Sequence, residues 1–228
     1  MALAVALLGT LNNGTASTLA SDSVSPSASS LLIGIGGSKD NAAPTPHGTP
    51  VTVSGLTNVG SWTERAGQSS AEESGSYAGL YAHTAQVTGA GGTGTITIAY
   101  TQGQSGLVGA WIEVTGHNLS SPIRQVAEGA STTATCASTF SLAPVSTSLL
   151  VGGCVERDSN NTITVPTGWT KLDELNSSSL CQMAVGYKLG SGATTNTWSG
   201  LGTTRNFSFV LEIPLASASK RRRVFMMG

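Results

Sequence analysis

Residues 148–158 read SLLVGGCVERD and repeat an earlier stretch, residues 30–40, which reads SLLIGIGGSKD. Each stretch begins at a serine-rich turn, continues through a run of apolar residues and ends in charged residues. A short, continuous apolar run of this kind is typical of a β-strand that is covered on both faces. The repetition predicts that two equivalent buried strands organise the chain, and that the charges after each strand lie in a turn.

Further pairs of similar segments follow in the same order in the two halves. These are Ser61-Trp62-Thr63 with Gly168-Trp169-Thr170, Gly79-Leu80-Tyr81 with Val185-Gly186-Tyr187, and Trp111-Ile112-Glu113-Val114 with Val210-Leu211-Glu212-Ile213. The separation between partners falls from 118 positions for Leu31 and Leu149 to 99 positions for Glu113 and Glu212. This is expected when strands are shared and loops differ in length. The chain is therefore an internal duplication with half-repeats at 1–117 and 118–216.

The composition favours strands joined by tight turns. Only 10% of the 228 residues are charged, 29 are glycine, and no helical period is sustained over ten residues. We expect about six strands per half and an all-β, antiparallel β-sandwich of jelly-roll or lectin-like type with an internal pseudo-twofold repeat. A single sandwich over 1–216 is preferred to two tandem sandwiches. The joint at 116–122 is short, and each half alone would bury a thin core.

The expected strands follow the apolar and alternating runs. They lie at 1–8, 14–23, 31–35, 51–53, 62–65, 77–87, 95–101 and 107–114 in the first half, and at 131–142, 149–156, 163–165, 169–172, 181–189, 194–198 and 207–213 in the second. Strict alternation in 95–101 places Ile96, Ile98 and Tyr100 on one face. The proline-rich residues 40–50 are predicted to form a surface loop. Residues 1–8 lack a charged segment and are too short to span a bilayer of about 30 Å, so a buried first strand is expected and no membrane association.

No residue cluster indicates a metal or a cofactor. The three cysteines, Cys136, Cys154 and Cys181, show no CxxC spacing and support neither a disulfide framework nor a zinc site. Cys154 and Cys181 are instead expected to act as small apolar side chains on core strands. The three histidines, His47, His83 and His117, show no metal-ligand spacing either.

Glu113 and Glu212 occupy equivalent positions in the two halves. A pseudo-twofold axis could bring them together as the carboxylate pair that glycosidases use. The simpler interpretation is that each is the outward, polar residue of an otherwise apolar strand. We therefore assign no catalytic residue.

Three tryptophans are candidates for a sugar-binding surface: Trp62, Trp169 and Trp198. An exposed indole ring can stack on a saccharide. However, Trp62 and Trp169 recur at equivalent positions after glycine-rich turns, and this pattern favours a structural plug at a corner of the sandwich.

The C-terminal segment 217–228 combines a basic run with an apolar one. Its residues are Lys220, Arg221, Arg222 and Arg223, followed by Val224, Phe225, Met226 and Met227. Four of the 11 basic residues lie here, which leaves a net charge of −5 on the rest of the chain and makes nucleic-acid binding an unfavourable interpretation. A solvated tail is the alternative. Because the apolar residues are unfavourable in water, we expect this segment to dock on a partner.

The sequence resembles a group of structural proteins of tailed-phage and prophage virions, which are Ser/Thr/Gly-rich, two-half, lectin-like β-sandwiches. The residues that carry the resemblance are Ser148-Leu149-Leu150-Val151-Gly152, Pro166-Thr167-Gly168-Trp169-Thr170, Ala184-Val185-Gly186-Tyr187-Lys188 and the segment 207–213. The first half departs from the pattern, since no Pro-x-Gly precedes Trp62.

The resemblance implies a non-enzymatic virion protein, a head decoration or cement protein made in the host cytoplasm and placed on the outer particle surface. Its implied partners are a major capsid or tail protein and further copies of itself, as in a trimer, with no cofactor. The alternative is a tail or fibre adhesin that binds a host glycan. A more distant alternative is a glycoside hydrolase that uses Glu113 and Glu212.

Overall fold

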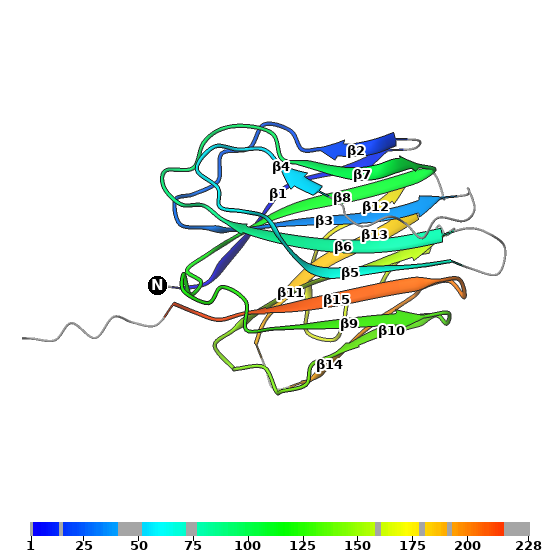
Figure 1. The fold of residues 1–228 in the computed structure, drawn as a ribbon. Helices are drawn as coiled ribbons and strands as arrows, with labels where there is room; N and C mark the ends of the chain where they lie inside the picture. Colours follow the sequence, from blue (N-terminus) through cyan, green and yellow to red (C-terminus); the bar gives the residue numbers. More distant parts are fainter. Residues whose placement is uncertain are drawn as a thin grey trace, which may run out of the picture.

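The computed structural model describes residues 2–13, 16–40, 52–71, 77–157, 161–177, 181–190 and 193–216. All regular structure in these ranges is antiparallel β-strand, which confirms the expected all-β class and the β-sandwich (Figure 1). Within the same ranges there is no helix long and apolar enough to cross a membrane. The C-terminal segment 217–228 and the proline-rich residues 41–51 lie outside the described residues.

The first half forms a five-stranded sheet with a three-stranded sheet over one face. The five-stranded sheet has the order β1-β8-β3-β6-β5, and the three-stranded sheet has the order β2-β7-β4. The strands are β1 (Ala4–Asn13), β2 (Ala16–Ala20), β3 (Leu31–Asp40), β4 (Thr52–Ser54), β5 (Thr63–Ala71), β6 (Tyr77–Gln86), β7 (Thr97–Gln104) and β8 (Gly106–Thr115).

The second half repeats this arrangement. Its five-stranded sheet has the order β12-β13-β11-β15-β9, and a two-stranded sheet of β10 and β14 covers it. The strands are β9 (Gln125–Ser131), β10 (Thr135–Thr139), β11 (Leu149–Arg157), β12 (Thr170–Ser177), β13 (Cys181–Leu189), β14 (Thr195–Ser199) and β15 (Asn206–Ile213). An isolated bridge between Thr164 and Ser199 takes the place of β4. The two halves therefore share one topology, with β3 equivalent to β11 and β8 equivalent to β15.

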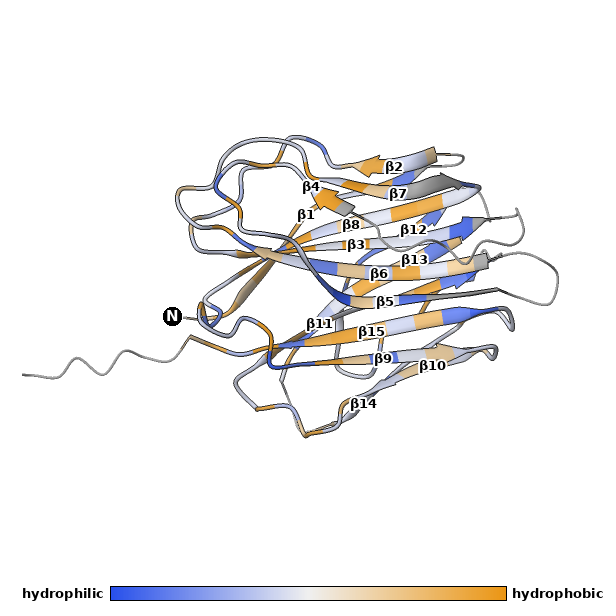
Figure 2. Cartoon of the chain, in the orientation of Figure 1, coloured by the Kyte–Doolittle hydropathy of each residue, from blue (hydrophilic) through white to orange (hydrophobic). Residues whose placement is uncertain are grey.

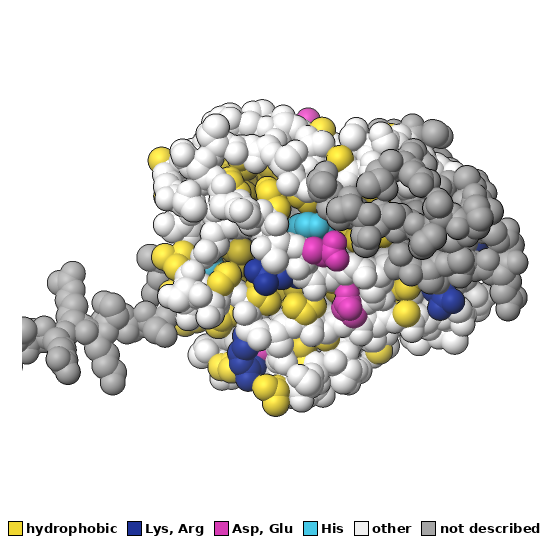
Figure 3. Space-filling view, in the orientation of Figure 1, with side chains coloured by type: hydrophobic (Ala, Val, Ile, Leu, Met, Phe, Trp, Pro, Cys, Tyr) yellow, Lys and Arg dark blue, Asp and Glu magenta, His cyan; other side chains and the backbone are white. Residues whose placement is uncertain are grey.

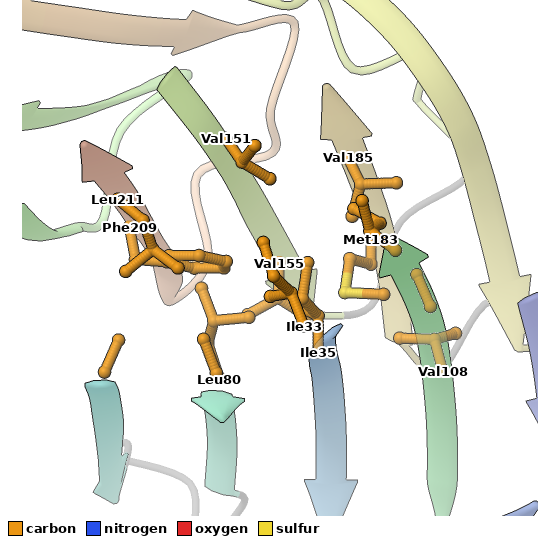
Figure 4. Packing of buried hydrophobic residues seen from close by; sticks show 14 of the residues in the cluster. Ile33, Ile35, Leu80, Val108, Val151, Val155, Met183, Val185, Phe209 and Leu211 are labelled. Carbon is orange, nitrogen blue, oxygen red and sulfur yellow. The ribbon is translucent and has the colours of Figure 1, made fainter. Parts of the chain in front are cut away.

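The molecule has four layers, with the two large sheets inside and the two small sheets outside. The inner faces of the large sheets pack on each other, and Figure 4 shows Leu80 beneath Phe209, Ile33 and Ile35 beside Val155, and Val108 beneath Met183. Each half is thus a sandwich of its own, and the halves share this central core. The expectation of a single two-sheet sandwich is therefore corrected to two sandwiches joined through a common core. The reason is that each large sheet carries apolar side chains on both faces, so each face must be covered by another sheet.

Two outer cores lie between each large sheet and its small sheet. The first contains Leu32 and Trp111 of the large sheet against Ile98 of the small one. The second contains Leu150 and Val210 against Trp198, among others. The central strands β3 and β11 are buried along nearly their whole length, so both faces are covered, as the apolar runs predicted. In the hydropathy view, β3 shows orange segments between paler ones (Figure 2).

The alternation predicted for 95–101 is confirmed. Ile96, Ile98 and Tyr100 are all buried in the first outer core. The Tyr100 ring meets the Tyr81 ring edge to face, with centroids 6.1 Å apart. This packing depends on glycine at Gly36, where an added Cβ would lie 2.4 Å from the Tyr100 hydroxyl oxygen.

Both edges of each large sheet are covered by the other half. β1 lies against β12, where the Thr10 hydroxyl donates to Asp173 at 2.9 Å. β5 lies against β9, where the Gly67 amide donates to Glu128 at 3.0 Å. Because β1 is equivalent to β9 and β5 to β12, the two contacts are related by the same pseudo-twofold axis. The arrangement closes on itself and protects edges that would otherwise pair with other chains.

Several predicted strand boundaries are wrong. β1 is an edge strand whose side chains are half-buried or exposed, so the expectation of a buried first strand is not met. β3 continues to Asp40, and Glu156 and Arg157 lie within β11, so most of the charged residues end strands and do not form turns. β9 was not predicted at all, because Gln125–Ser131 is half-polar and lacks a clear apolar pattern.

Candidate functional site

Glu113 and Glu212 each hold the turn that precedes the central strand of their half. The Ser27 amide donates to Glu113 Oε1 at 2.5 Å, and the Val145 amide donates to Glu212 Oε1 at 2.8 Å. Ser27 and Val145 both lie four residues before the equivalent leucines that begin β3 and β11. The same carboxylate therefore fixes the same turn in both halves.

Glu212 is held more tightly than Glu113. Its side chain is fully buried, and it accepts further hydrogen bonds from Ser148 Oγ at 2.8 Å, Gln125 Nε2 at 2.6 Å and Arg124 Nη1 at 2.6 Å. Burial of this carboxylate acts to raise its pKa, but the hydrogen bonds outweigh that effect and the pKa lies below the ordinary value of 4.5. Glu212 is thus an ionised structural group at neutral pH.

The two glutamates do not form a catalytic pair. Glu113 lies on the same face of its sheet as Trp111, and Glu212 lies on the same face as Val210, so both point toward the outer cores. The central core separates the two sheets, which in face-to-face packing lie about 10 Å apart. Because the carboxylates point away from each other across that distance, they cannot act on one glycosidic bond. The expectation that each glutamate is an outward, polar residue is wrong, because both side chains are buried under the small sheets and adjoining turns.

Two of the three candidate tryptophans are buried. Trp169 is 8% exposed and Trp198 is inaccessible, and their ring centroids lie 5.8 Å apart in the second outer core. Neither presents a ring face to a sugar in this structure. Trp62 is half-buried.

Trp62 and Trp169 play the same packing role in the two halves. Each ring covers a glycine of the central strand: an added Cβ would lie 3.7 Å from the Trp62 ring at Gly34 and 3.3 Å from the Trp169 ring at Gly152. These glycines are equivalent, because each lies three residues after the first leucine of its strand. The recurrence of Trp in the sequence is explained by this packing.

The other polar candidates are dispersed. His83 is buried on β6 with its Nε2 3.6 Å from Glu64, His117 is buried at the joint between the halves, and His47 lies outside the described residues. All three cysteines are buried, and the burial of Cys154 and Cys181 agrees with their expected role as apolar side chains on core strands. Among the described residues, no group of three or more His, Cys, Asp and Glu side chains could hold a metal ion.

The beginning of the chain, the joint and the last described residues meet at one end of the molecule. The Ala216 amide donates to the Gly116 carbonyl at 2.9 Å, and Ala2 lies against Gly116 so closely that an added Cβ would meet its carbonyl oxygen at 2.2 Å. Leu215 also forms a bridge with His117. Both ends of the described chain therefore lie together, as Figure 1 shows at the left.

Within the described part of the chain, four large apolar side chains are exposed, and all of them lie at this same end; they are Leu119, Leu142, Val145 and Leu189, between 43% and 63% exposed. Leu189 pairs with the first residue of β11, and Leu142 and Val145 belong to the loop that precedes β11. Leu119 belongs to the joint, where its carbonyl accepts from Gln86 at the end of β6. We call these four residues and the chain ends beside them the attachment end.

The attachment end was not predicted from the sequence. Leu142 was expected within a strand, Leu189 at the end of one and Leu119 in the joint, so none was separated from residues that fill a core. Elsewhere the face shown in Figure 3 carries few charged side chains, in keeping with the low charge of the sequence. Comparisons of the chain with protein-family models, with curated proteins and with solved structures find no match.

Proposed function

We propose that the protein is a non-enzymatic structural component of a phage virion, a decoration or cement protein on the outer surface of the head. It binds a major capsid or tail protein through the attachment end and presents the rest of the sandwich outward. The resemblance described above supports this assignment at the level of sequence. The segment 217–228, with its basic and apolar residues, is part of the same proposal as a docking segment.

The observation that carries the proposal is the uneven distribution of exposed apolar side chains. Large apolar residues exposed together are unfavourable in water and mark surfaces that contact another protein. Here all four of them lie where both ends of the described chain meet. A chain anchored at that end would cover them, and segment 217–228 would begin beside the partner surface.

The rest of the fold suits a role in attachment. The β1–β12 and β5–β9 contacts and the shared central core join the halves into one block. Covered edges of the large sheets limit unwanted strand pairing between crowded neighbours. Glycan binding by a tail or fibre adhesin is the second candidate, and of the three tryptophans only Trp62 is half-buried, whereas Trp169 and Trp198 are buried.

The first experiment is to purify phage particles from the host that carries the gene and to analyse their proteins by mass spectrometry. We expect the chain in the particles at a fixed copy number per capsid, and imaging of the particles should place it on the head surface. Its absence from purified particles would refute the proposal.

A second experiment tests the attachment end itself. Particles that lack the protein are incubated with wild-type protein or with the double variant Leu142→Asp, Leu189→Asp, and bound protein is measured after sedimentation. Thr203→Asp is the control, because Thr203 is exposed in the loop at the other end of β15. We expect at least a tenfold loss of binding for the double variant and none for the control. Equal binding of all three proteins would show that attachment uses another surface.

A further inference from the structure

A row of three buried polar side chains crosses the second large sheet at the end opposite the attachment end. Gln182 on β13 and Asn206 on β15 both pair directly with Glu156 on β11. Cys154 and Ala184, two residues along from Glu156 and Gln182, face the second outer core, so the row lies on that same face. The three side chains are 3%, 0% and 0% exposed for Gln182, Glu156 and Asn206.

Each member of the row has one oxygen atom that receives no hydrogen bond from the described residues. These atoms are Gln182 Oε1, Glu156 Oε2 and Asn206 Oδ1. Directly opposite residues of an antiparallel pair have Cβ atoms about 4.5–5.5 Å apart, so the two amide side chains are the immediate neighbours of the Glu156 carboxylate on either side. A buried oxygen without a donor is costly, and three together require a common explanation.

The orientations of the two amides are fixed by their nitrogen atoms. Asn206 Nδ2 donates to the carbonyls of Thr133 and Gly202 at 2.8 and 2.9 Å. Gln182 Nε2 donates to Glu174 Oε1 at 2.5 Å and to the Asn161 carbonyl. Rotating either amide would place an oxygen against two acceptors, so an exchange of oxygen and nitrogen cannot satisfy the row.

The number of oxygen atoms without a donor shows which kind of partner could satisfy all three members of the row. A proton on Glu156 would satisfy that oxygen and one neighbouring oxygen, which leaves the third without a donor. One water molecule has two hydrogens and so also leaves one of the three oxygens without a donor. A cation can contact all three oxygens and also neutralise the buried carboxylate. We propose that Glu156, Gln182 and Asn206 bind a small, oxygen-preferring metal cation of the calcium class.

The chemistry of the ligands fits this class. Calcium accepts carboxylate oxygens together with side-chain amide oxygens and water, whereas magnesium requires a stricter octahedral arrangement. Asn161, which donates to Glu156 Oε1 at 3.1 Å, is itself exposed, so the buried row lies directly beneath a surface residue. Lys171 already neutralises Glu174, with 2.6 Å between the charged atoms.

The charge on Glu156 is unfavourable without a cation. Burial raises the pKa of this carboxyl group above its ordinary value, and the nearby Glu174 acts in the same direction, while hydrogen bonds from Gly202 and Asn161 act against it. With a single direct carboxylate, we expect a dissociation constant on the order of 0.1–1 mM, as in weak calcium sites. The equivalent position in the first half is Ser38, so the site belongs to the second half alone.

The test is thermal unfolding of the full chain, dialysed against EDTA, in 10 mM CaCl₂, 10 mM MgCl₂ or NaCl of equal ionic strength. For the wild type, 10 mM calcium at this dissociation constant stabilises the fold by about 1.4–2.7 kcal/mol, and we expect Tm to rise by about 3–11 °C. Glu156→Gln should lose this response while keeping a metal-free Tm at least equal to that of the wild type, because it removes a buried charge. Asp22→Asn, which changes an exposed carboxylate of the first half, should respond as the wild type does.

Calcium binding to the wild type is measured separately by equilibrium dialysis, so that a folding defect in Glu156→Gln does not decide the outcome. We expect one ion per chain. Absence of both bound calcium and a Tm response would overturn the proposal, as would an equal response in Glu156→Gln. If the wild-type Tm does not change with calcium but rises on acidification from pH 7.5 to 5.5, a proton on Glu156 completes the row. That result would also overturn the proposal of a cation site.

Discussion

Replacing Glu212 by alanine tests how far one carboxylate stabilises the second half. The substitution removes a fully buried anion that accepts four hydrogen bonds, from one backbone amide and three side chains. Ser148 is 1% exposed and loses its partner in a buried position, whereas the Arg124 side chain is 33% exposed and can be rehydrated. Removing one member of a buried charged pair costs about 3–5 kcal/mol, and we expect Glu212→Ala to lose an amount in this range.

The equivalent substitution in the first half is the matched control. Glu113 accepts one hydrogen bond of this kind, from the Ser27 amide, and its side chain retains 8% exposure. A single hydrogen bond to a charged acceptor contributes about 1.5–3 kcal/mol. The loss in free energy of unfolding should therefore be smaller for Glu113→Ala than for Glu212→Ala, by about 1 kcal/mol or more. Both substitutions remove the same side chain from the same place in the repeat.

The assay is urea unfolding followed by tryptophan fluorescence, repeated between pH 7 and pH 3. The pKa of Glu212 is lowered in the folded state, so its contribution is complete above the unfolded pKa of about 4.3 and is lost as the pH falls through the folded pKa. The difference in unfolding free energy between wild type and Glu212→Ala should shrink below about pH 4. Equal losses for the two alanine variants, or a difference that does not change with pH, would refute this account of the turn.

Three further predictions follow from packing. Gly36→Ala should lower the free energy of unfolding by about 1–3 kcal/mol, because the new methyl group would meet the Tyr100 hydroxyl. Gly34→Ala is the control: its Cβ would contact neighbours at 3.7 Å, so its stability should be within about 1 kcal/mol of wild type. Urea unfolding measures both variants. Asp173→Asn should change stability by less than about 1 kcal/mol, because its bond with Thr10 lies at a partly exposed seam; a larger loss would mean that this seam is critical for joining the halves. No thiol should react with a chromogenic disulfide reagent in the native protein, and all should react in denaturant; rapid native labelling would contradict the burial of Cys136, Cys154 and Cys181.

Much of the fold could be predicted from local patterns. The duplicated apolar runs at 31–35 and 149–156 identified the central strands, because a strand covered on both faces has no need of polar alternation. The alternation of Ile96, Ile98 and Tyr100 identified one face of β7 and of the residues before it. The order of the repeated segments also indicated that the two halves share one topology, as they do.

The candidate site could not be predicted in the same way. Glu113 and Glu212 were recognised as equivalent, but the sequence does not record on which face of a double sheet each lies, and a pseudo-twofold axis can either bring equivalent residues together or direct them apart. Trp169 and Trp198 illustrate the same limit, because an indole that fills a core and one that binds a ligand look alike until neighbouring strands are placed.

The sequence by itself determined the class of fold, the duplication and the identity of the buried strands, because these depend on the periodicity of neighbouring residues. Only the tertiary structure decided that the two large sheets pack face to face, that the glutamates point outward to hold turns, and that Leu119, Leu142, Val145 and Leu189 share one end with both ends of the described chain. It also placed Glu156 beside Gln182 and Asn206. These are contacts between residues distant along the chain, and strand register and layer packing, which no local pattern encodes, bring them together.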